Sequence, residues 1–338
     1  MSKPVRMSDI AKKVGVSTVT VSKALAGKDG VSAELRARIK ETSQEMGYQQ
    51  AASPHRSHRG DAGNIGILIP VCFIQQNMNS FYWELYEEVV SRLLLNSCYG
   101  ILELLSEETV QNLTLPRILQ DGKTDGLVVI GQVGERYRRM LMKQAAIPMV
   151  FLDSYDSCGS GYSVISDGYY GMYFVTNFLL SLGHRNIHFV GTISSTSSIS
   201  DRYFGYCRAM TEHGIAVTDS MVLPDRDEHG NIRFHVPDTL PTAFVCNCDL
   251  TAYEVIDQLK TRGLRVPDDV SVAGFDHFSV PYHTVPALTT YAVDMPAMAR
   301  VCVDSLLHQI RHKRPLNDGI KVVSGKLIVG NSVKSVSS

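Results

Sequence analysis

The feature that most constrains the fold is the alternation, from residue 65 onward, of short apolar runs with helix-length amphipathic segments. An apolar run at residues 65–70 precedes a segment with helical periodicity at 81–97, and a second run follows at 99–104. This alternation is typical of βαβ units, and the continuous apolar character of the runs predicts parallel strands buried on both faces. Further strands are expected at 127–130, 149–152, 187–190, 243–246 and 270–275.

The region that carries this alternation, residues 64–338, is larger than one hydrophobic core usually supports. We therefore expect two lobes. The first lobe is expected to contain residues 64–162 and 293–318, and the second lobe residues 163–292 and 319–338. Because ligands bind at the carboxyl ends of parallel strands, the expected ligand site is a cleft where the strand ends of both lobes face each other.

Residues 1–47 predict a different, all-α unit. Apolar positions recur at helical spacing in three short stretches between residues 7 and 47, with Gly15 and Gly27 between them. Ser17 can cap the second helix, residues 18–26, and two helices joined by a tight turn form a helix-turn-helix. Because three small helices bury little surface, their apolar side chains must pack together, and we expect this core to contain Val14, Val16, Val21, Leu25 and Leu35.

A linker and an uneven charge distribution separate these two parts. Residues 48–63 lack apolar periodicity and are rich in Ala, Ser, Gln, His and Arg, which is typical of a linker. Residues 1–60 contain eleven Lys and Arg but five Asp and Glu, a net charge of +6, whereas the remaining residues carry −7. A basic head attracts polyanions, because neutralising phosphates releases counterions. The alternative is a solvated basic surface with no such role.

Metal, cofactor and catalytic signatures are weak. The seven cysteines are scattered and lie mostly in apolar runs, which favours reduced thiols over a disulfide framework. Cys246 and Cys248 form a C-x-C pair without a second ligand pair, so no metal site is expected. Dinucleotide-binding, Walker, Gly-x-Ser-x-Gly and His-Glu-x-x-His motifs do not occur, so we expect neither an enzyme nor a cofactor. Without a long apolar span or a secretory signal, we expect a cytoplasmic protein with no membrane partner.

Five segments resemble the lactose/galactose-repressor family. Residues 7–27, MSDIAKKVGVSTVTVSKALAG, are similar almost position for position to its DNA-binding signature, and LGHRNI at 182–187, GLRVPDDVSV at 263–272, GFD at 274–276 and PALTT at 286–290 also agree. The resemblance implies an α/β fold in which a two-lobed sensor, similar to periplasmic binding proteins and built of parallel sheets flanked by helices, follows the helix-turn-helix head. It implies a homodimeric transcriptional regulator, a repressor, that binds a near-palindromic operator in double-stranded DNA.

The same resemblance assigns DNA contacts to the second helix of the head, which would enter the major groove. Thr18 and Val19 occupy the positions that vary with operator sequence. Such short side chains favour an apolar contact with a thymine methyl over a bidentate hydrogen bond to guanine. Lys23 stands where the family often has Arg and could donate to guanine or phosphate. Phosphate contacts or helix capping are expected for Ser17, Thr20 and Ser22. For each residue the alternative is a capping or surface role.

The linker departs from the family pattern. In the family, a hinge helix normally inserts a leucine between bases from the minor groove. In this sequence Ser57 stands at the position of that leucine, and a serine cannot unstack bases. Pro54 would interrupt such a helix outside its first turn. Arg56 and Arg59 can still track phosphates, so we expect the bound DNA to be less bent than is usual for the family.

Effector contacts are implied at four places, with a sugar as the expected ligand. Asn79, Phe81 and Tyr82 follow the first strand, and an aromatic ring at this place can stack on a sugar or base face. Arg202 matches the family's ligand-clamping arginine and Asp276 its hydroxyl-accepting aspartate. Cys248 replaces an amide, which removes a strong donor and acceptor.

Each effector assignment has a structural alternative. Arg202 could form a surface salt bridge, Asp276 could cap a strand end, and the aromatic pair could belong to the core. We expect Asp249 to act only as a helix N-cap. The alternative function is a periplasmic-type solute receptor, which shares the two-lobed body but would lack the basic head and carry a secretory signal.

Overall fold

The structure is a computed structural model that describes residues 7–25, 30–46, 63–74, 81–227, 230–277, 286–314, 316 and 318–336. The contacts divide the chain into two units, Met1–Arg59 and Gly60–Ser338. Most of the predicted linker, including Pro54, Arg56, Ser57 and Arg59, lies outside the described residues, as do Gly27 and Asn79. Within the described ranges, every helix is too short or too polar to cross a membrane.

The first unit is a head of three helices, α1 (Met7–Val14), α2 (Thr18–Leu25) and α3 (Ala33–Glu45). In the turn between α1 and α2, the Ser17 hydroxyl accepts a hydrogen bond from the Thr20 N–H at 3.1 Å. The core of this head consists of Ile10, Ala11, Val14, Val21, Ala24 and Ile39, with Met7, Val16, Val31, Leu35 and Met46 packed against it. The predicted head and its core are therefore confirmed, apart from Leu25, whose side chain is outside the described part of the structure.

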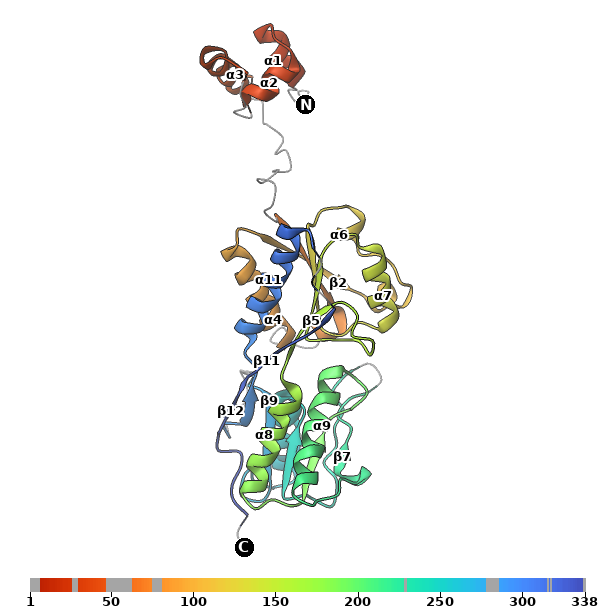
Figure 1. The fold of residues 1–338 in the computed structure, drawn as a ribbon. Helices are drawn as coiled ribbons and strands as arrows, with labels where there is room; N and C mark the ends of the chain where they lie inside the picture. The colour runs from red at the N-terminus through yellow and green to blue at the C-terminus, as the bar shows by residue number, and fades with distance from the viewer. Residues whose placement is uncertain are drawn as a thin grey trace. The chain divides into compact units, whose positions relative to one another are not determined.

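The first lobe of the second unit contains a six-stranded parallel sheet in the order β11-β5-β4-β3-β1-β2. Helices pack on both faces because the strands are apolar on both sides. One face is covered by α4 (Phe81–Leu95) and α11 (Met295–His312), and the other by α6 (Arg117–Gln120) and α7 (Glu135–Gln144) (Figure 1). The strands are β1 (Asn64–Pro70), β2 (Tyr99–Leu105), β3 (Gly126–Ile130), β4 (Met149–Leu152), β5 (Tyr162–Ser166) and β11 (Gly319–Val323), and the short helices are η1 (Val71–Phe73) and α5 (Glu107–Gln111).

The second lobe repeats this plan with the strand order β12-β10-β9-β8-β6-β7, in which only the β10–β12 pair, among the described strands, is antiparallel. Helices α8 (Gly168–Ser181) and α9 (Ser197–Glu212) cover one face, and α10 (Asp249–Thr261) covers the other. The strands are β6 (Ile187–Val190), β7 (Val222–Leu223), β8 (Ala243–Cys246), β9 (Ser271–Asp276), β10 (Thr289–Ala292) and β12 (Lys326–Ile328), and η2 spans Asp219–Met221. The predicted α/β fold of two parallel-sheet lobes is confirmed.

The chain passes between the lobes three times, after β5, after β10 and after β11. Strands β5 and β11 pair with each other in the first sheet, from Tyr162 opposite Gly319 to Ser166 opposite Val323. The crossings therefore lie a few residues beyond the expected boundaries at 162 and 318. The displacement has a physical reason: β11 is a largely exposed edge strand and lacks the continuous apolar run that reveals a central strand.

Candidate functional site

Helix α2 has one face buried in the core of the head and one face exposed to solvent. Val21 and Ala24 are fully buried, whereas Thr18, Val19, Ser22 and Lys23 are exposed. Val19 leaves 62% of its surface exposed, although it is a branched apolar residue. A single exposed face that carries hydroxyl, methyl and ammonium groups suits the edges and phosphates of a nucleic-acid groove.

The two other predicted DNA contacts on the head stand at the start of α2. Ser17 accepts from the Thr20 N–H, and the two hydroxyl oxygens lie 2.9 Å apart. These bonds give Ser17 the capping role that was the stated alternative, and they fix the direction in which α2 begins. Arg56 lies outside the described residues.

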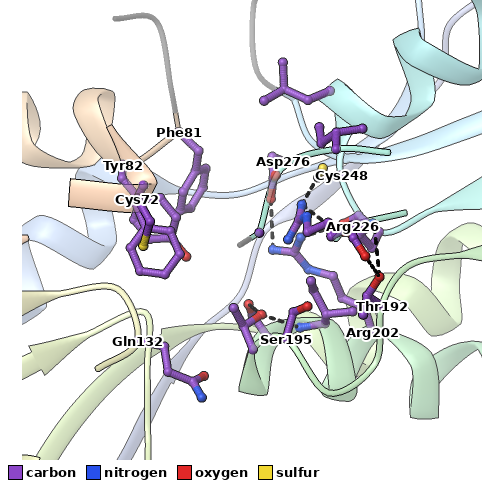
Figure 2. A pocket seen from close by; sticks show the side chains of 18 of the residues that line it. Cys72, Phe81, Tyr82, Gln132, Thr192, Ser195, Arg202, Arg226, Cys248 and Asp276 are labelled. Atoms are coloured by element: carbon purple, nitrogen blue, oxygen red, sulfur yellow. Dashed lines mark hydrogen bonds and ion pairs between the residues drawn. The ribbon is translucent and has the colours of Figure 1, made fainter. Parts of the chain in front are cut away.

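A cavity of about 1040 Å³ lies between the two lobes at the carboxyl ends of their strands. Figure 2 shows Phe81 and Tyr82 on one side of this interlobe cleft and Arg202, Cys248 and Asp276 on the other. The structure thus brings together every described residue that the sequence assigned to the effector. The remaining one, Asn79, is outside the described ranges.

The first lobe contributes an aromatic wall. The rings of Phe73 and Tyr82 lie 4.5 Å apart, and Phe81 meets Tyr82 edge-on at 5.3 Å. All three side chains are partly buried against the core of the first lobe while lining the cleft. The core role and the ligand-facing role were alternatives in the sequence, but the structure is compatible with both at once. The rings of this aromatic wall offer faces on which a sugar or base can stack.

Arg202, in α9, is held rigidly and is only 4% exposed. Its guanidinium donates to the Asn247 carbonyl at 2.5 Å and to Asp276 Oδ1 at 2.9 Å, and it stacks over the Phe275 ring at 4.0 Å. The surface salt bridge considered for this residue is therefore wrong, because the ion pair is buried. The planar fork of arginine is already bound to protein acceptors, so its main effect is to position Asp276.

Asp276 ends β9 and Asp153 directly follows β4, so the two lobes each place one carboxylate at a strand end. Both have positive φ angles, +104° for Asp276 and +60° for Asp153, a backbone conformation that non-glycine residues rarely adopt outside functional sites and turns. Burial raises the pKa of Asp276 to about 6 and that of Asp153 to about 7, while Arg202 acts in the opposite direction on both. The pair places carboxyl oxygens from both lobes where they can bind ligand hydroxyl or amine groups.

Sequence reasoning missed Asp153. Its Oδ2 accepts from the Tyr82 hydroxyl at 3.1 Å, but its buried Oδ1 has no hydrogen-bond partner in the protein. A ligand donor would satisfy this oxygen. A signal was available, because a polar residue directly after the predicted strand 149–152 must lie at the carboxyl edge of the sheet.

The other side of the cleft is organised by a buried carboxylate, Asp225. It accepts from the Thr192 N–H at 2.8 Å, from Asn247 at 2.6 Å and from the Thr251 hydroxyl at 2.7 Å. This network supports Arg226, whose Nη2 lies 3.4 Å from Cys248 Sγ. Arg226 was also missed by sequence reasoning, since it follows a strand of only two residues.

Two positions at the start of α10 depart from expectation. Cys248 is 7% exposed, burial raises the pKa of its thiol, and it occupies the N-cap position without a capping bond. Asp249 is the first helical residue, and its buried Oδ1 accepts from the Thr290 hydroxyl at 2.7 Å. The predicted N-cap role of Asp249 is therefore wrong, because its side chain turns to β10 instead of the helix end. No cluster of three or more His, Cys, Asp or Glu side chains suited to a metal is found among the described residues.

Among the residues that the structure describes, Gln132 and Tyr155 of the first lobe form hydrogen bonds with the second lobe across the cleft. The Gln132 side-chain oxygen accepts from the Ser197 N–H at the start of α9 at 2.7 Å, and the Tyr155 hydroxyl donates to Asp201 at 2.6 Å. A ligand that changes the separation of the lobes must also change these bonds.

Comparisons with known proteins match both units. A model of bacterial regulatory proteins of the lacI family matches residues 6–50, and a model of a periplasmic binding protein-like domain matches residues 176–333. The HTH-type transcriptional repressor PurR of Vibrio campbellii is 26% identical over 343 residues, which cover 98% of this chain and 99% of that protein. Catabolite control protein A of Priestia megaterium is 27% identical over 337 residues, with coverage of 98% and 99%.

Solved structures share the fold. The lac repressor dimer bound to operator and the anti-inducer ONPF superimposes with a TM-score of 0.76 at 20% identity, covering 98% of this chain and 100% of that chain. A complex of the transcriptional regulator CelR with cellobiose gives a TM-score of 0.68 at 20% identity, with coverage of 97% and 99%.

Proposed function

Because the chain belongs to the lacI family of bacterial regulatory proteins, we propose that it represses transcription by binding operator DNA through α2, under the control of a sugar-like effector in the interlobe cleft. The chain is a DNA-binding regulator and not an enzyme. The observation that carries the DNA-binding part is the exposed face of α2, opposite a buried one. We place this activity in the cytoplasm, where operator DNA is found.

The side chains on α2 favour particular contacts. Thr18 and Val19 carry methyl groups that fit against a thymine methyl, and neither can form the two-pronged hydrogen bond that selects guanine. Lys23 supplies a point charge for guanine or phosphate at the end of the same face. A homodimer would present two such helices to a near-palindromic operator, with half-sites one helical turn apart or a multiple of it.

The cleft supports a neutral, hydroxyl-rich effector. Asp153 and Asp276 offer acceptors from opposite lobes, and the aromatic wall of Phe73, Phe81 and Tyr82 offers a stacking surface. Both arginines of the cleft are paired with carboxylates, Arg202 with Asp276 and Arg226 with Asp225, and this charge balance makes a phosphorylated ligand less suitable. The effector can shift operator binding only through its different affinity for the two lobe arrangements.

Selection of operators from randomised double-stranded DNA tests the proposal directly. The full-length chain should enrich a near-palindromic sequence, and Val19→Ser should change the preferred base at the position that Val19 contacts without lowering the melting temperature. Lys143→Ser, an exposed change on α7 of the second unit, is the matched control and should leave the preference unchanged. Failure of the wild-type chain to enrich any sequence would overturn the proposal. With the selected operator, a panel of sugars and nucleosides then identifies the effector as the compound that changes DNA affinity.

A further inference from the structure

A second cavity, of about 550 Å³, opens at the opposite edge of the first sheet from the interlobe cleft. It lies at the amino ends of β3, β4 and β5, beside the carboxyl-terminal ends of α7 and α11. Its wall is mainly apolar and includes Met142, Ile147, Met149, Tyr162 and Ile310. We propose that this amino-edge cavity is a second ligand site, which binds a small apolar molecule carrying a carboxylate.

The first reason is an unsatisfied donor in the cavity wall. Gln309 lines the cavity, is only 4% exposed, and its side-chain Nε2 has no hydrogen-bond partner in the protein. Buried amide donors in folded proteins nearly always have an acceptor, because an unpaired one is costly. A ligand oxygen is the acceptor that this position lacks.

The second reason is the charge at the rim. Lys313 and Arg314 are exposed at the end of α11, and neither forms an ion pair with another described residue. Each of the two acidic residues of the cavity has one carboxylate oxygen held by backbone donors. Asp125 accepts from the Gly63 and Asn64 N–H groups at 2.9 and 3.0 Å, and Asp318 accepts from the Gly161 N–H at 3.0 Å.

These features select the chemical class of the ligand. An apolar wall favours a hydrocarbon or aromatic body, and the volume lies within the range of small-molecule sites. A carboxylate accepts from the buried amide donor of Gln309 and attracts the cations at the rim, whereas an alcohol of the same shape lacks the charge. A sugar, in contrast, would leave most of its hydroxyl groups against apolar atoms.

Isothermal titration of the full-length chain tests this site. The probes are 3-phenylpropanoate and its neutral match, 3-phenylpropan-1-ol, and the carboxylate should bind more tightly. Gln309→Glu replaces the side-chain amide donor by a carboxylate, which repels the carboxylate of the probe. This change should weaken carboxylate binding by roughly tenfold to a hundredfold. The double variant Lys313→Gln/Arg314→Gln changes only exposed residues, so it should fold normally and still weaken binding several-fold.

A control locates the probe, and three outcomes would overturn the proposal. Asp153→Asn removes a charge from the interlobe cleft and should leave probe affinity unchanged, because the probe binds at the other edge of the sheet. The proposal fails if the carboxylate does not bind at millimolar concentration, if the alcohol binds equally well, or if the rim double variant binds like the wild type. No DNA is present, so these results are independent of whether the operator proposal holds.

Discussion

The substitution Asp153→Asn should stabilise the ligand-free protein at neutral and alkaline pH, although it removes a residue of the cleft. Asp153 is 4% exposed, one of its oxygens has no partner, and burial raises its pKa from 3.8 to about 7. The charged form is therefore unfavourable in the folded state. Asparagine has nearly the same shape, keeps an acceptor for the Tyr82 hydroxyl, and carries no charge.

The sign and the size follow from proton linkage. Between the unfolded and folded pKa values the folded state binds more protons, so stability falls as pH rises through this window. Each pH unit is worth about 1.4 kcal/mol, and the whole interval from 3.8 to about 7 corresponds to about 4 kcal/mol. The new amide nitrogen lacks an acceptor, which costs about 1 kcal/mol. The net gain should be about 3 kcal/mol near pH 8 and close to zero near pH 4.5.

Thermal unfolding of the full-length wild type and Asp153→Asn across this pH range measures the effect. For the second unit, about 3 kcal/mol corresponds to a rise in melting temperature of roughly 5 °C near pH 8. Asp238→Asn, the same chemical change at an exposed position, should shift the melting temperature little at any pH. The reasoning is refuted if the Asp153→Asn difference is independent of pH, or if the variant is less stable than the wild type near pH 8.

Two further substitutions probe the supports of the cleft. Arg202→Met leaves Asp276 as a buried, unpaired carboxylate and should destabilise the second unit by about 3–5 kcal/mol at neutral pH, measured by urea unfolding, with a smaller loss below the Asp276 pKa of about 6. Gly205→Ala should destabilise by about 2 kcal/mol or more, because its Cβ would approach the Tyr169 carbonyl oxygen where α8 and α9 cross; equal melting temperatures would contradict this close approach.

The central strands were the part of the fold that could be predicted best. Residues 149–152, 187–190 and 243–246 form strands with the expected bounds, because strands buried on both faces need continuous apolar runs. The edge strands could not be located in this way. Residues 319–323 form a largely exposed edge strand without a continuous apolar run, so the expected boundary at 318 assigned this strand to the second lobe, although it pairs with β5 in the first sheet.

A site residue could be predicted when its own segment of sequence determines its position, and could not when its position depends on how distant segments pack. Asp276 ends a strand within a matched motif, and Arg202, inside α9, was identified by its match to a family position; both lie in the cleft. Asp153 and Arg226 belong to no matched motif, and their place in the cleft depends on how the two sheets face each other. Asp249 shows the opposite error, because a local capping rule was applied to a side chain whose partner, Thr290, lies on a strand distant in sequence.

The position of β1 explains how one lobe could serve two sites. At its amino end, Asn64 and Gly63 are held by Asp125, a residue of the amino-edge cavity. At its carboxyl end, β1 leads into η1, whose Phe73 belongs to the aromatic wall of the interlobe cleft. β1 pairs with β2 along its whole length and with β3 from Ile65 to Leu68, so it is an interior strand of the sheet. A ligand at either edge would therefore lie beside residues joined to the same strand, and Gly63 immediately precedes this strand on the side of the linker to the DNA-binding head.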